Sequence, residues 1–352
     1  MATLTERLLK NSTINETSLI TESKVYGKKE MVPTPVPMVN VALSGSLDGG
    51  LVPGFTMLAG PSKHFKTAFS LLMAASYLKR YSDSILLFYD SEFGTPQSYF
   101  KAFNIPLDRV LHTPVTDIEE LKHDITKQLE EIKRGDRVVI VIDSIGNLAS
   151  RKEAEDALEG KTAADMTRAK QLKSLFRIVT PKLSMKDIPL IAVNHTYKTM
   201  EMYAKDVVGG GTGSYYSADT IWIIGRQQEK EGGEVSGYNF VINVEKSRYV
   251  KEKSKIPITV SFAGGIKKWS GILDIAVEGG FLNKVNRGSK GTHIQVIDPE
   301  TGETVGEEVK LSTIEDDKDF WITLMKDKKF QEYIKLRYEL VSESLIEDDS
   351  EE

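Results

Sequence analysis

The sequence of 352 residues predicts an α/β fold, with a mostly parallel central sheet flanked by helices and a small α+β unit behind it. The first observation is a set of strand-length segments that are almost wholly apolar, at residues 84–90, 137–144 and 188–195. The second is a set of segments with the helical spacing of apolar residues, at 67–79, 119–134 and 166–183. Apolar strands that alternate with helices are typical of a parallel sheet covered on both faces.

A third observation is a phosphate-binding loop after the first strand. Apolar residues 56–59 lead into it, and its residues are Gly60, Pro61, Ser62, Lys63, His64, Phe65, Lys66 and Thr67. The layout is G-x-x-x-x-G-K-[ST], except that Phe65 replaces the second glycine. Backbone N–H groups would surround the phosphates of a nucleotide, Lys66 would reach the β- and γ-phosphates, and Thr67 would bind Mg²⁺. For this stretch alone, a Gly-Pro turn before an ordinary amphipathic helix is the alternative.

Polar residues follow the predicted carboxyl ends of three further strands, where parallel sheets bind their ligands. Asp143 would hold Mg²⁺ through water, or would cap the next turn. Glu92, just beyond Asp90, could orient and deprotonate an attacking water, or be a solvated loop carboxylate. His195 could contact the γ-phosphate, or be a core histidine with its hydrogen bonds satisfied. The agreement between separate strand ends favours a nucleotide site.

Two long segments without a clear element, residues 145–165 and 196–217, also follow strand ends. They carry amide, basic, aromatic and glycine residues: Asn147, Arg151, Lys152 and Lys161 in the first, and Tyr197, Lys198, Tyr203, Lys205, Gly209, Gly210 and Gly211 in the second. Loops of this length are usually functional. Basic and aromatic residues on a glycine-rich loop suit a strand of nucleic acid, although an active-site lid would have a similar composition.

The remaining segments divide the chain into four parts. Residues 1–31 form a polar arm outside the core, and the prolines at 33, 35 and 37 favour an extended linker. The core is expected at 32–269, where alternating segments after residue 219 read as antiparallel strands. A small unit follows at 270–341, with helices near 274–278, 318–326 and 328–341 and a hairpin turn at 298–302. Residues 342–352 form an acidic tail.

The composition narrows the class of protein. The chain lacks cysteine, which excludes disulfides, thiolate metal sites and a cysteine nucleophile and fits a reducing cytoplasm. We find no secretory signal and no apolar stretch long enough to span a membrane. A net charge of −5 argues against a uniformly basic nucleic-acid surface but permits a local basic groove.

Together these residues resemble the RecA superfamily of strand-exchange recombinases, and more closely its UvsX-type branch in tailed phages. The likeness runs from about residue 1 to 340, and its clearest stretches are 40–67, 88–94, 138–150, 165–181, 194–196, 209–219 and 243–255. An aromatic residue at the place of Phe65 is a feature of the phage branch. The resemblance implies a RecA-type ATPase core, cofactors ATP and Mg²⁺, and a cytoplasmic location in an infected bacterial host.

The resemblance also implies roles for single residues, beginning with Glu92 as the glutamate that activates water. Tyr99 occupies the place of an aromatic residue that stacks on adenine. His195 stands where the bacterial protein has a glutamine that links the γ-phosphate to a DNA loop. Lys246 and Arg248 match a basic pair that reaches the ATP of the neighbouring subunit, much as an arginine finger does.

By this resemblance the protein is a DNA-dependent ATPase in recombination, repair and recombination-dependent replication. It would form helical filaments on single-stranded DNA and exchange that strand into homologous duplex. Residues 145–165 and 196–217 would be the two DNA-binding loops, 270–340 would contact duplex, and the arm would dock on the next protomer. A recombination mediator and a single-strand-binding protein are the expected partners. The alternatives are a hexameric helicase with the same core and a nucleotide-switched scaffold or signalling protein.

Overall fold

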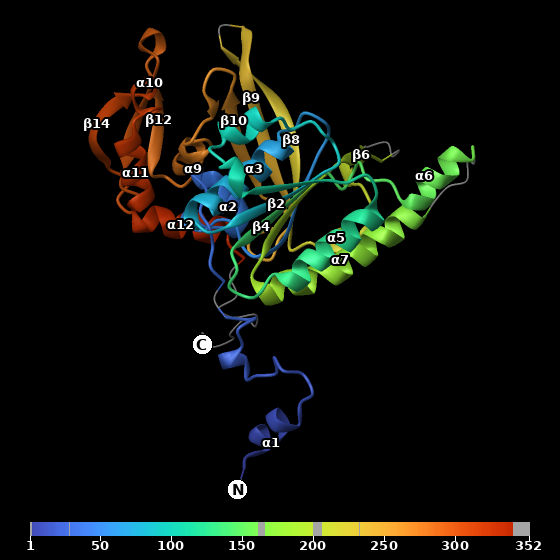
Figure 1. The fold of residues 1–352 in the computed structure, drawn as a ribbon. Helices are drawn as coiled ribbons and strands as arrows, with labels where there is room; N and C mark the ends of the chain where they lie inside the picture. Colours follow the sequence, from blue (N-terminus) through green and yellow to red (C-terminus); the bar gives the residue numbers. More distant parts are fainter. Residues whose placement is uncertain (1, 28, 161–165, 200–205, 232, 341–352) are drawn as a thin grey trace.

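The computed structural model describes residues 2–27, 29–160, 166–199, 206–231 and 233–340, and a nine-stranded sheet forms its centre (Figure 1). From edge to edge the strands are β11 (Gly265–Ile266), β10 (Lys255–Ser261), β9 (Glu234–Lys246), β8 (Thr220–Glu231), β1 (Gly54–Ala59), β5 (Pro189–Asn194), β4 (Val138–Asp143), β2 (Ile85–Asp90) and β3 (Val110–Pro114). Every neighbouring pair from β8 to β3 is parallel, and the pairs from β8 to β11 are antiparallel. The predicted α/β fold with a mostly parallel sheet is confirmed.

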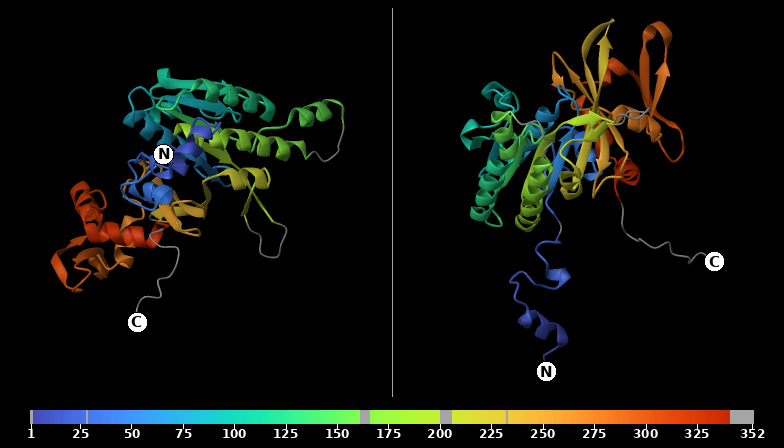
Figure 2. Two further views of the ribbon diagram at one scale, coloured as in Figure 1. Left: turned by 90° about the horizontal axis from the view of Figure 1, so that it is seen from below. Right: turned by 90° about the vertical axis from the view of Figure 1, so that its right-hand side faces the viewer.

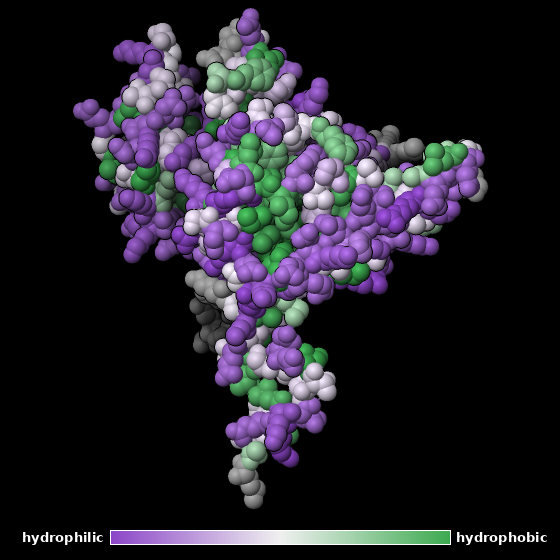
Figure 3. Space-filling model, in the orientation of Figure 1, coloured by the Kyte–Doolittle hydropathy of each residue, from purple (hydrophilic) through white to green (hydrophobic). Residues whose placement is uncertain are grey.

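Helices cover both faces of this sheet. On one face α3 (Lys66–Arg80) packs on β1, β2, β4 and β5, and on the other lie α5 (Ile118–Glu131) and α7 (Thr167–Lys186) (Figure 2). Side chains of β1 alternate between the two layers: Leu58 faces the α3 layer, and Phe55 stacks on Phe176 of α7 with ring centroids 4.4 Å apart. The outward surfaces of α5 and α7 are mainly hydrophilic in the view of Figure 3. None of the described helices combines the length and apolar character that a bilayer-spanning helix needs.

The segment before β1 differs from the prediction of an extended linker, because it continues as a helix from Pro37. It contains α2 (Pro37–Ser44), all of whose residues are buried, and the preceding Val32 pairs with Leu51. Pro37 begins the helix with a preset φ, and Gly45 ends it in the left-handed region at φ 78°. Because α2 is buried all round, it has no polar face whose spacing would mark it as a helix.

The arm outside the core contains α1 (Leu4–Asn11) and the 3₁₀ turn η1 (Ile20–Glu22), and it extends away from the body of the molecule (Figure 1). A capping box between Thr3 and Glu6 begins α1, and no residue of this helix is buried. The base of the arm is attached to the core, where Lys29 Nζ donates to the carbonyl of Ser184 at 3.2 Å.

The two segments predicted as loops contain short elements. The first holds α6 (Arg151–Leu158), which begins with a capping box between Ser150 and Glu153 that was visible in the sequence. The second holds the hairpin β6 (Thr196–Lys198) with β7 (Asp206–Val208), and then α8 (Thr212–Ser217). Lys161, Tyr203 and Lys205 lie outside the described residues.

A small C-terminal unit packs beside β10 (Figure 1). Its elements are α9 (Ile272–Glu278), the antiparallel strands β12 (Leu282–Asn286), β13 (Thr292–Ile297) and β14 (Thr304–Lys310), the 3₁₀ turn η3 (Gly288–Lys290), and the helices α10 (Leu311–Ile314), α11 (Lys318–Lys326) and α12 (Lys328–Tyr338). The chain after α12 returns to the core, where the amide of Leu340 donates to the carbonyl of Tyr249 at 2.8 Å.

Candidate nucleotide-binding and catalytic site

A cavity of about 540 Å³ lies beyond the carboxyl ends of β1, β4 and β5. Its lining includes most of the predicted nucleotide and catalytic residues: Ser62, Lys63, His64, Phe65, Lys66, Thr67, Glu92, Tyr99, Asp143 and His195. It also includes side chains from the antiparallel part of the sheet: Arg226, Tyr238, Phe240, Val260 and Phe262. The structure therefore brings the predicted residues together at one place.

Lys66 lies inside the curve of the phosphate loop. Its ammonium donates to the carbonyls of Gly60 at 2.9 Å and Pro61 at 2.7 Å. Burial lowers the pKa of Lys66, while the nearby carboxylates of Glu92 and Asp143 act in the opposite direction. The charge of the ammonium attracts an anion such as a phosphate. The amino end of α3 adds to this attraction, because it carries the positive end of the helix dipole.

Phe65 has a left-handed backbone, with φ 61° and ψ 16°, a conformation that glycine adopts without a steric cost. This conformation costs about 1–2 kcal/mol for a residue with a Cβ. Its ring stacks on Phe240 with centroids 4.9 Å apart and meets the edge of Phe69 at 5.5 Å. Because each aromatic pair contributes about 0.5–1.5 kcal/mol, these contacts offset much of the backbone cost.

Asp143 has the properties of a ligand for a hard divalent cation. The hydroxyl of Thr67 donates to its Oδ2 at 2.8 Å, and its Oδ1 is buried without a hydrogen-bond partner. Burial raises the pKa of Asp143 to about 6, although the hydrogen bond from Thr67 acts in the opposite direction. Among the described residues no group of three or more acidic or histidine side chains could hold a metal alone. Mg²⁺ would suit this pair, because it usually takes one or two protein ligands with phosphates and water.

The buried charge of Asp143 leads to a prediction about stability. The pKa of Asp143 rises from 3.8 to about 6 on folding, so the folded protein binds a proton at this group more tightly than the unfolded chain does. This preference contributes fully to the free energy of unfolding below pH 3.8. The contribution is lost as the pH rises through 6. Asp143→Asn keeps an acceptor for Thr67 and removes the charge. We expect its free energy of unfolding, measured by urea denaturation without Mg²⁺ at pH 7.5, to exceed the wild-type value by about 2–3 kcal/mol. The difference should disappear near pH 4.

The matched control is Asp83→Asn, which alters an exposed aspartate between α3 and β2 and should change stability little at either pH. Equal stability of Asp143→Asn and wild type at pH 7.5 would contradict the expectation that Asp143 is charged and poorly solvated in the folded protein.

Glu92 follows β2 and is fixed by its neighbours. Asp90 accepts hydrogen bonds from the amides of Glu92 at 3.1 Å and Phe93 at 2.8 Å. Glu92 Oε1 accepts from the Ser144 hydroxyl at 2.6 Å and lies 3.0 Å from His195 Nε2. The hydrogen bond with His195, followed by that from Ser144, lowers the pKa of Glu92 to about 2. Glu92 is therefore a carboxylate at neutral pH, able to orient a water molecule.

His195 lies in the cavity, and its side chain retains 39% of its exposure. This position differs from that of a core histidine. The backbone of Gly146 approaches its ring so closely that an added Cβ would lie 2.5 Å from Cδ2 of His195. The ring lies against the start of the segment after β4 and contacts Glu92.

Tyr99, from α4 (Gln97–Ala102), and Phe262, just after β10, line the same cavity. The family resemblance of the sequence predicts a role for Tyr99 but not for Phe262, Tyr238, Phe240 or Arg226. The available signal was the alternation of β9, which puts Tyr238 and Phe240 on one face of a strand. Aromatic rings of this kind can stack on a nucleotide base.

Lys246 and Arg248 lie away from this cavity. Lys246 lies opposite Ile221 of β8, which in turn lies opposite Met57 in the middle of β1. The phosphate loop begins only after Ala59, at the carboxyl end of β1. Lys246 Nζ donates to the carbonyls of Tyr215 and Tyr216 at the end of α8, at 3.2 and 3.1 Å. Arg248 Nε lies 2.6 Å from Asp219 Oδ1, and its side chain is 71% exposed.

The described residues predicted to bind nucleic acid lie on the segments after β4 and β5. Asn147 donates to the carbonyl of Ser91 at 2.8 Å. Three of the cations have acidic neighbours: Arg151 with Asp117 at 3.3 Å, Lys152 with Asp156 at 2.9 Å, and Lys198 with Asp206 at 3.6 Å. Tyr197 is 58% exposed, and Gly209, Gly210 and Gly211 precede α8.

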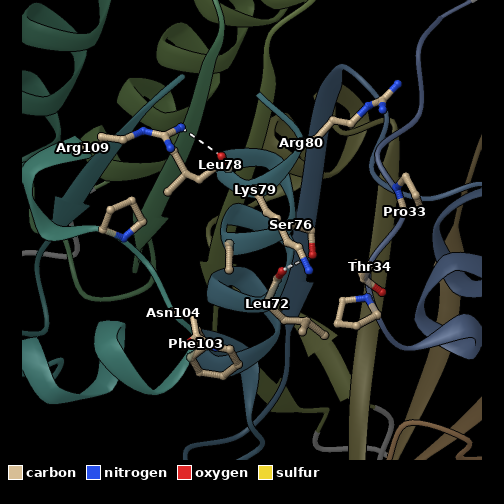
Figure 4. Close-up of a pocket in the computed structure, with 13 residues that line it drawn as sticks. Pro33, Thr34, Leu72, Ser76, Leu78, Lys79, Arg80, Phe103, Asn104 and Arg109 are labelled. Carbon is tan, nitrogen blue, oxygen red and sulfur yellow. Dashed lines mark hydrogen bonds between the residues drawn. The ribbon is translucent and has the colours of Figure 1, made fainter. Parts of the chain in front are cut away.

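A second groove, of about 970 Å³, lies between the carboxyl half of α3 and residues 33–35 (Figure 4). Arg109, from the 3₁₀ turn η2 (Leu107–Arg109), donates there to the carbonyls of Leu78 at 3.0 Å and Tyr81 at 2.6 Å. Arg109 thereby satisfies carbonyl groups at the end of α3. None of the predicted catalytic residues lines this groove, so the smaller cavity is the candidate nucleotide site.

Comparisons with known proteins find two family models and several relatives that match this chain. The family model for the RecA N-terminal domain matches residues 19–267, and the model for the C-terminal domain of the bacteriophage T4 recombination and repair protein matches residues 269–334. The recombination and repair protein of Enterobacteria phage T4 is 51% identical over 341 residues, covering 97% of this chain and 87% of the relative. The RecA proteins of Arthrobacter sp. (strain FB24) and Syntrophus aciditrophicus (strain SB) are 27% and 25% identical, each over 72% of this chain and 71% and 72% of the relative.

Proposed function

This chain belongs to the RecA family, in the branch of the T4 recombination and repair protein, and from that membership we propose that it assembles into helical filaments on single-stranded DNA. It is a recombinase and a DNA-dependent ATPase. In the proposed reaction the filament pairs with homologous duplex and exchanges its strand, in recombination, repair and recombination-dependent replication. The observation that carries the ATPase proposal is the meeting of Lys66, Thr67, Asp143, Glu92 and His195 at one cavity.

The residues of the cavity have separate roles in the proposed hydrolysis of ATP. The phosphate loop from Gly60 to Thr67 binds the phosphates, and Tyr99 binds the base. Thr67 and Asp143 hold Mg²⁺, which, when bound, neutralises charge on the β- and γ-phosphates. Glu92 orients the attacking water, and His195 contacts the γ-phosphate. Because Glu92 has a low pKa in contact with His195 and Ser144, it becomes a stronger base when these contacts lengthen.

The site is completed by a second subunit in this proposal. Neither Lys246 nor Arg248 lines the nucleotide cavity of its own chain. Arg248 pairs with Asp219, whose amide donates to the carbonyl of Phe55 near the amino end of β1, so the two cations suit the ATP of a neighbour better than their own. Cations supplied across an interface stabilise charge in the transition state of phosphoryl transfer. Hydrolysis would then depend on assembly, in which the arm at residues 1–31 docks on the adjacent protomer.

Nucleic acid is proposed to bind along the segments 145–165 and 196–217. Asn147, Arg151, Lys152, Tyr197 and Lys198 would contact single-stranded DNA, and so would Lys161, Tyr203 and Lys205. The carboxylates beside the three paired cations could be exchanged for DNA phosphates, because exposed ion pairs are worth only about 0–1 kcal/mol. The glycines at 209–211 would let the backbone approach the strand closely.

Further proposals concern the other parts of the chain and their partners. Residues 32–269 form the ATPase core, 270–341 contact duplex DNA, and 342–352 are an acidic tail. The protein would work with a recombination mediator and a single-strand-binding protein in the cytoplasm of an infected bacterial host.

Electron microscopy of the protein with single-stranded DNA and a slowly hydrolysed ATP analogue tests the proposed assembly. We expect helical filaments that require both ligands. Hexameric rings without filaments would instead support a helicase, and particles of single subunits would support a nucleotide-switched scaffold.

A further inference from the structure

Arg226 lies directly over the phosphate loop although it comes from the antiparallel part of the sheet. Ile223 of β8 pairs with Ala59, the last residue of β1, so Arg226, three residues further on, lies at the level of the loop. Its Nη1 donates to the carbonyl of Lys63 at 3.2 Å, and its guanidinium lies 4.7 Å from the ring centroid of Tyr238. Arg226 also lines the nucleotide cavity.

The loop needs support at two residues. Lys63 and Phe65 both have left-handed backbones, with φ values of 62° and 61°, and both carry a Cβ. Each such residue costs about 1–2 kcal/mol, so the loop would tend to relax to another shape without contacts that favour this one. A relaxed loop would no longer direct its N–H groups toward one phosphate position.

One cross-strand pair contacts both of these residues. Arg226 of β8 is directly opposite Phe240 of β9, and side chains in such a pair lie on the same face. Arg226 bonds to the carbonyl of Lys63, while Phe240 stacks on Phe65. The guanidinium of Arg226 also lies over the ring of Tyr238, in a cation–π contact. Thus every left-handed residue with a side chain in this loop is held from the same place on β8 and β9.

We propose that Arg226 is a positioning residue that, together with Phe240, holds the phosphate loop in its nucleotide-binding shape. This inference rests on the proposed nucleotide binding by the loop. In the general loop pattern a glycine stands at the place of Phe65 and adopts the left-handed backbone without cost. Here, contacts from β8 and β9 stabilise that backbone instead. Because the loop binds the α- and β-phosphates, its support should matter equally for ATP and ADP.

The test compares the affinities of ATP and ADP for Arg226→Gln, Arg226→Lys and wild type, by isothermal titration with Mg²⁺. We expect Arg226→Gln to weaken both nucleotides by the same factor, about 2- to 12-fold, which corresponds to the net contribution of one hydrogen bond. Arg226→Lys should recover part of the loss, since an ammonium can still donate to the carbonyl of Lys63. In DNA-stimulated turnover, KM for ATP should rise while kcat stays within about twofold.

Lys230→Gln is the matched control, because it removes one positive charge from the same strand at an exposed position that does not line the cavity. It should bind both nucleotides as wild type does. Loss of ATP affinity alone in Arg226→Gln would overturn the proposal in favour of a direct γ-phosphate contact. Unchanged affinities in Arg226→Gln would also overturn it, whereas failure of the wild type to bind either nucleotide would overturn the proposed function of the loop.

Discussion

Replacing Glu92 by glutamine is expected to lower the DNA-stimulated rate of ATP hydrolysis by about 10²–10⁴-fold, the usual contribution of a general base. Glutamine has nearly the same shape, and its Oε1 can still accept the hydrogen bond from Ser144. It cannot accept a proton from water. The affinity for ATP should therefore stay within about twofold of the wild-type value, because the phosphates are bound by other residues.

Single-turnover hydrolysis and equilibrium ATP binding, measured on the same preparations, separate the two effects. Glu131→Gln, at the exposed end of α5, is a control that should hydrolyse ATP normally. Normal turnover by Glu92→Gln would remove Glu92 from the mechanism. Because the pKa of Glu92 is about 2, titration of this carboxylate should also leave no step in the wild-type rate between pH 6 and 9.

Replacing Lys246 and Arg248 together by glutamine is expected to lower the DNA-stimulated rate by about 10³-fold or more, as loss of an arginine finger does. The ATP affinity of dilute single subunits should not change, since neither side chain lines the cavity of its own chain. Steady-state hydrolysis with single-stranded DNA and nucleotide titration at low protein concentration measure the two quantities. Asp219→Asn is a useful control, because it removes the partner of Arg248 and keeps both cations.

A mixing experiment distinguishes action on a neighbour from action on the same chain. In a 1:1 mixture, a subunit with Glu92 intact but without the cations can receive them from an adjacent Glu92→Gln subunit. A site is complete when its own subunit carries Glu92 and the neighbouring subunit carries the two cations. In random head-to-tail assembly each condition holds for half of the subunits, so about one site in four is complete. Two nearly inactive proteins should therefore together give about a quarter of the wild-type rate. A mixture as inactive as its components would show that Lys246 and Arg248 act within their own subunit or only on structure.

The elements that the sequence predicts well are those with one strong pattern. The continuous β-branched run of β4 and the apolar run of β2 each predict a buried strand of a parallel sheet. Asp90 and Asp143, the last residues of these strands, indicate where the candidate site lies. The loop between Gly60 and Thr67 had the spacing of a phosphate-binding loop, although Phe65 left an ordinary turn as the alternative. In these cases hydrophobic burial and local chemistry lead to the same structure.

Other features depend on the order of strands, which a single sequence does not contain. Glu92 and His195 were each placed at a strand end, but their contact arises because β4 lies between β2 and β5 and lets both side chains meet beside Ser144. Arg226 was missed because its position over the loop follows from the pairing of β8 with β1. In its own strand it looks like any exposed arginine.

The distance in the sheet between the phosphate loop and Lys246 has a consequence for the polymer as a whole. A protomer whose acceptor site and donor cations lie at different places has a direction, so the two ends of any open filament are chemically different. One terminal subunit holds ATP without a neighbour to complete its site, and the other holds cations without a site to complete. A row of n subunits therefore contains n − 1 complete sites, and turnover per subunit should rise with filament length toward a plateau.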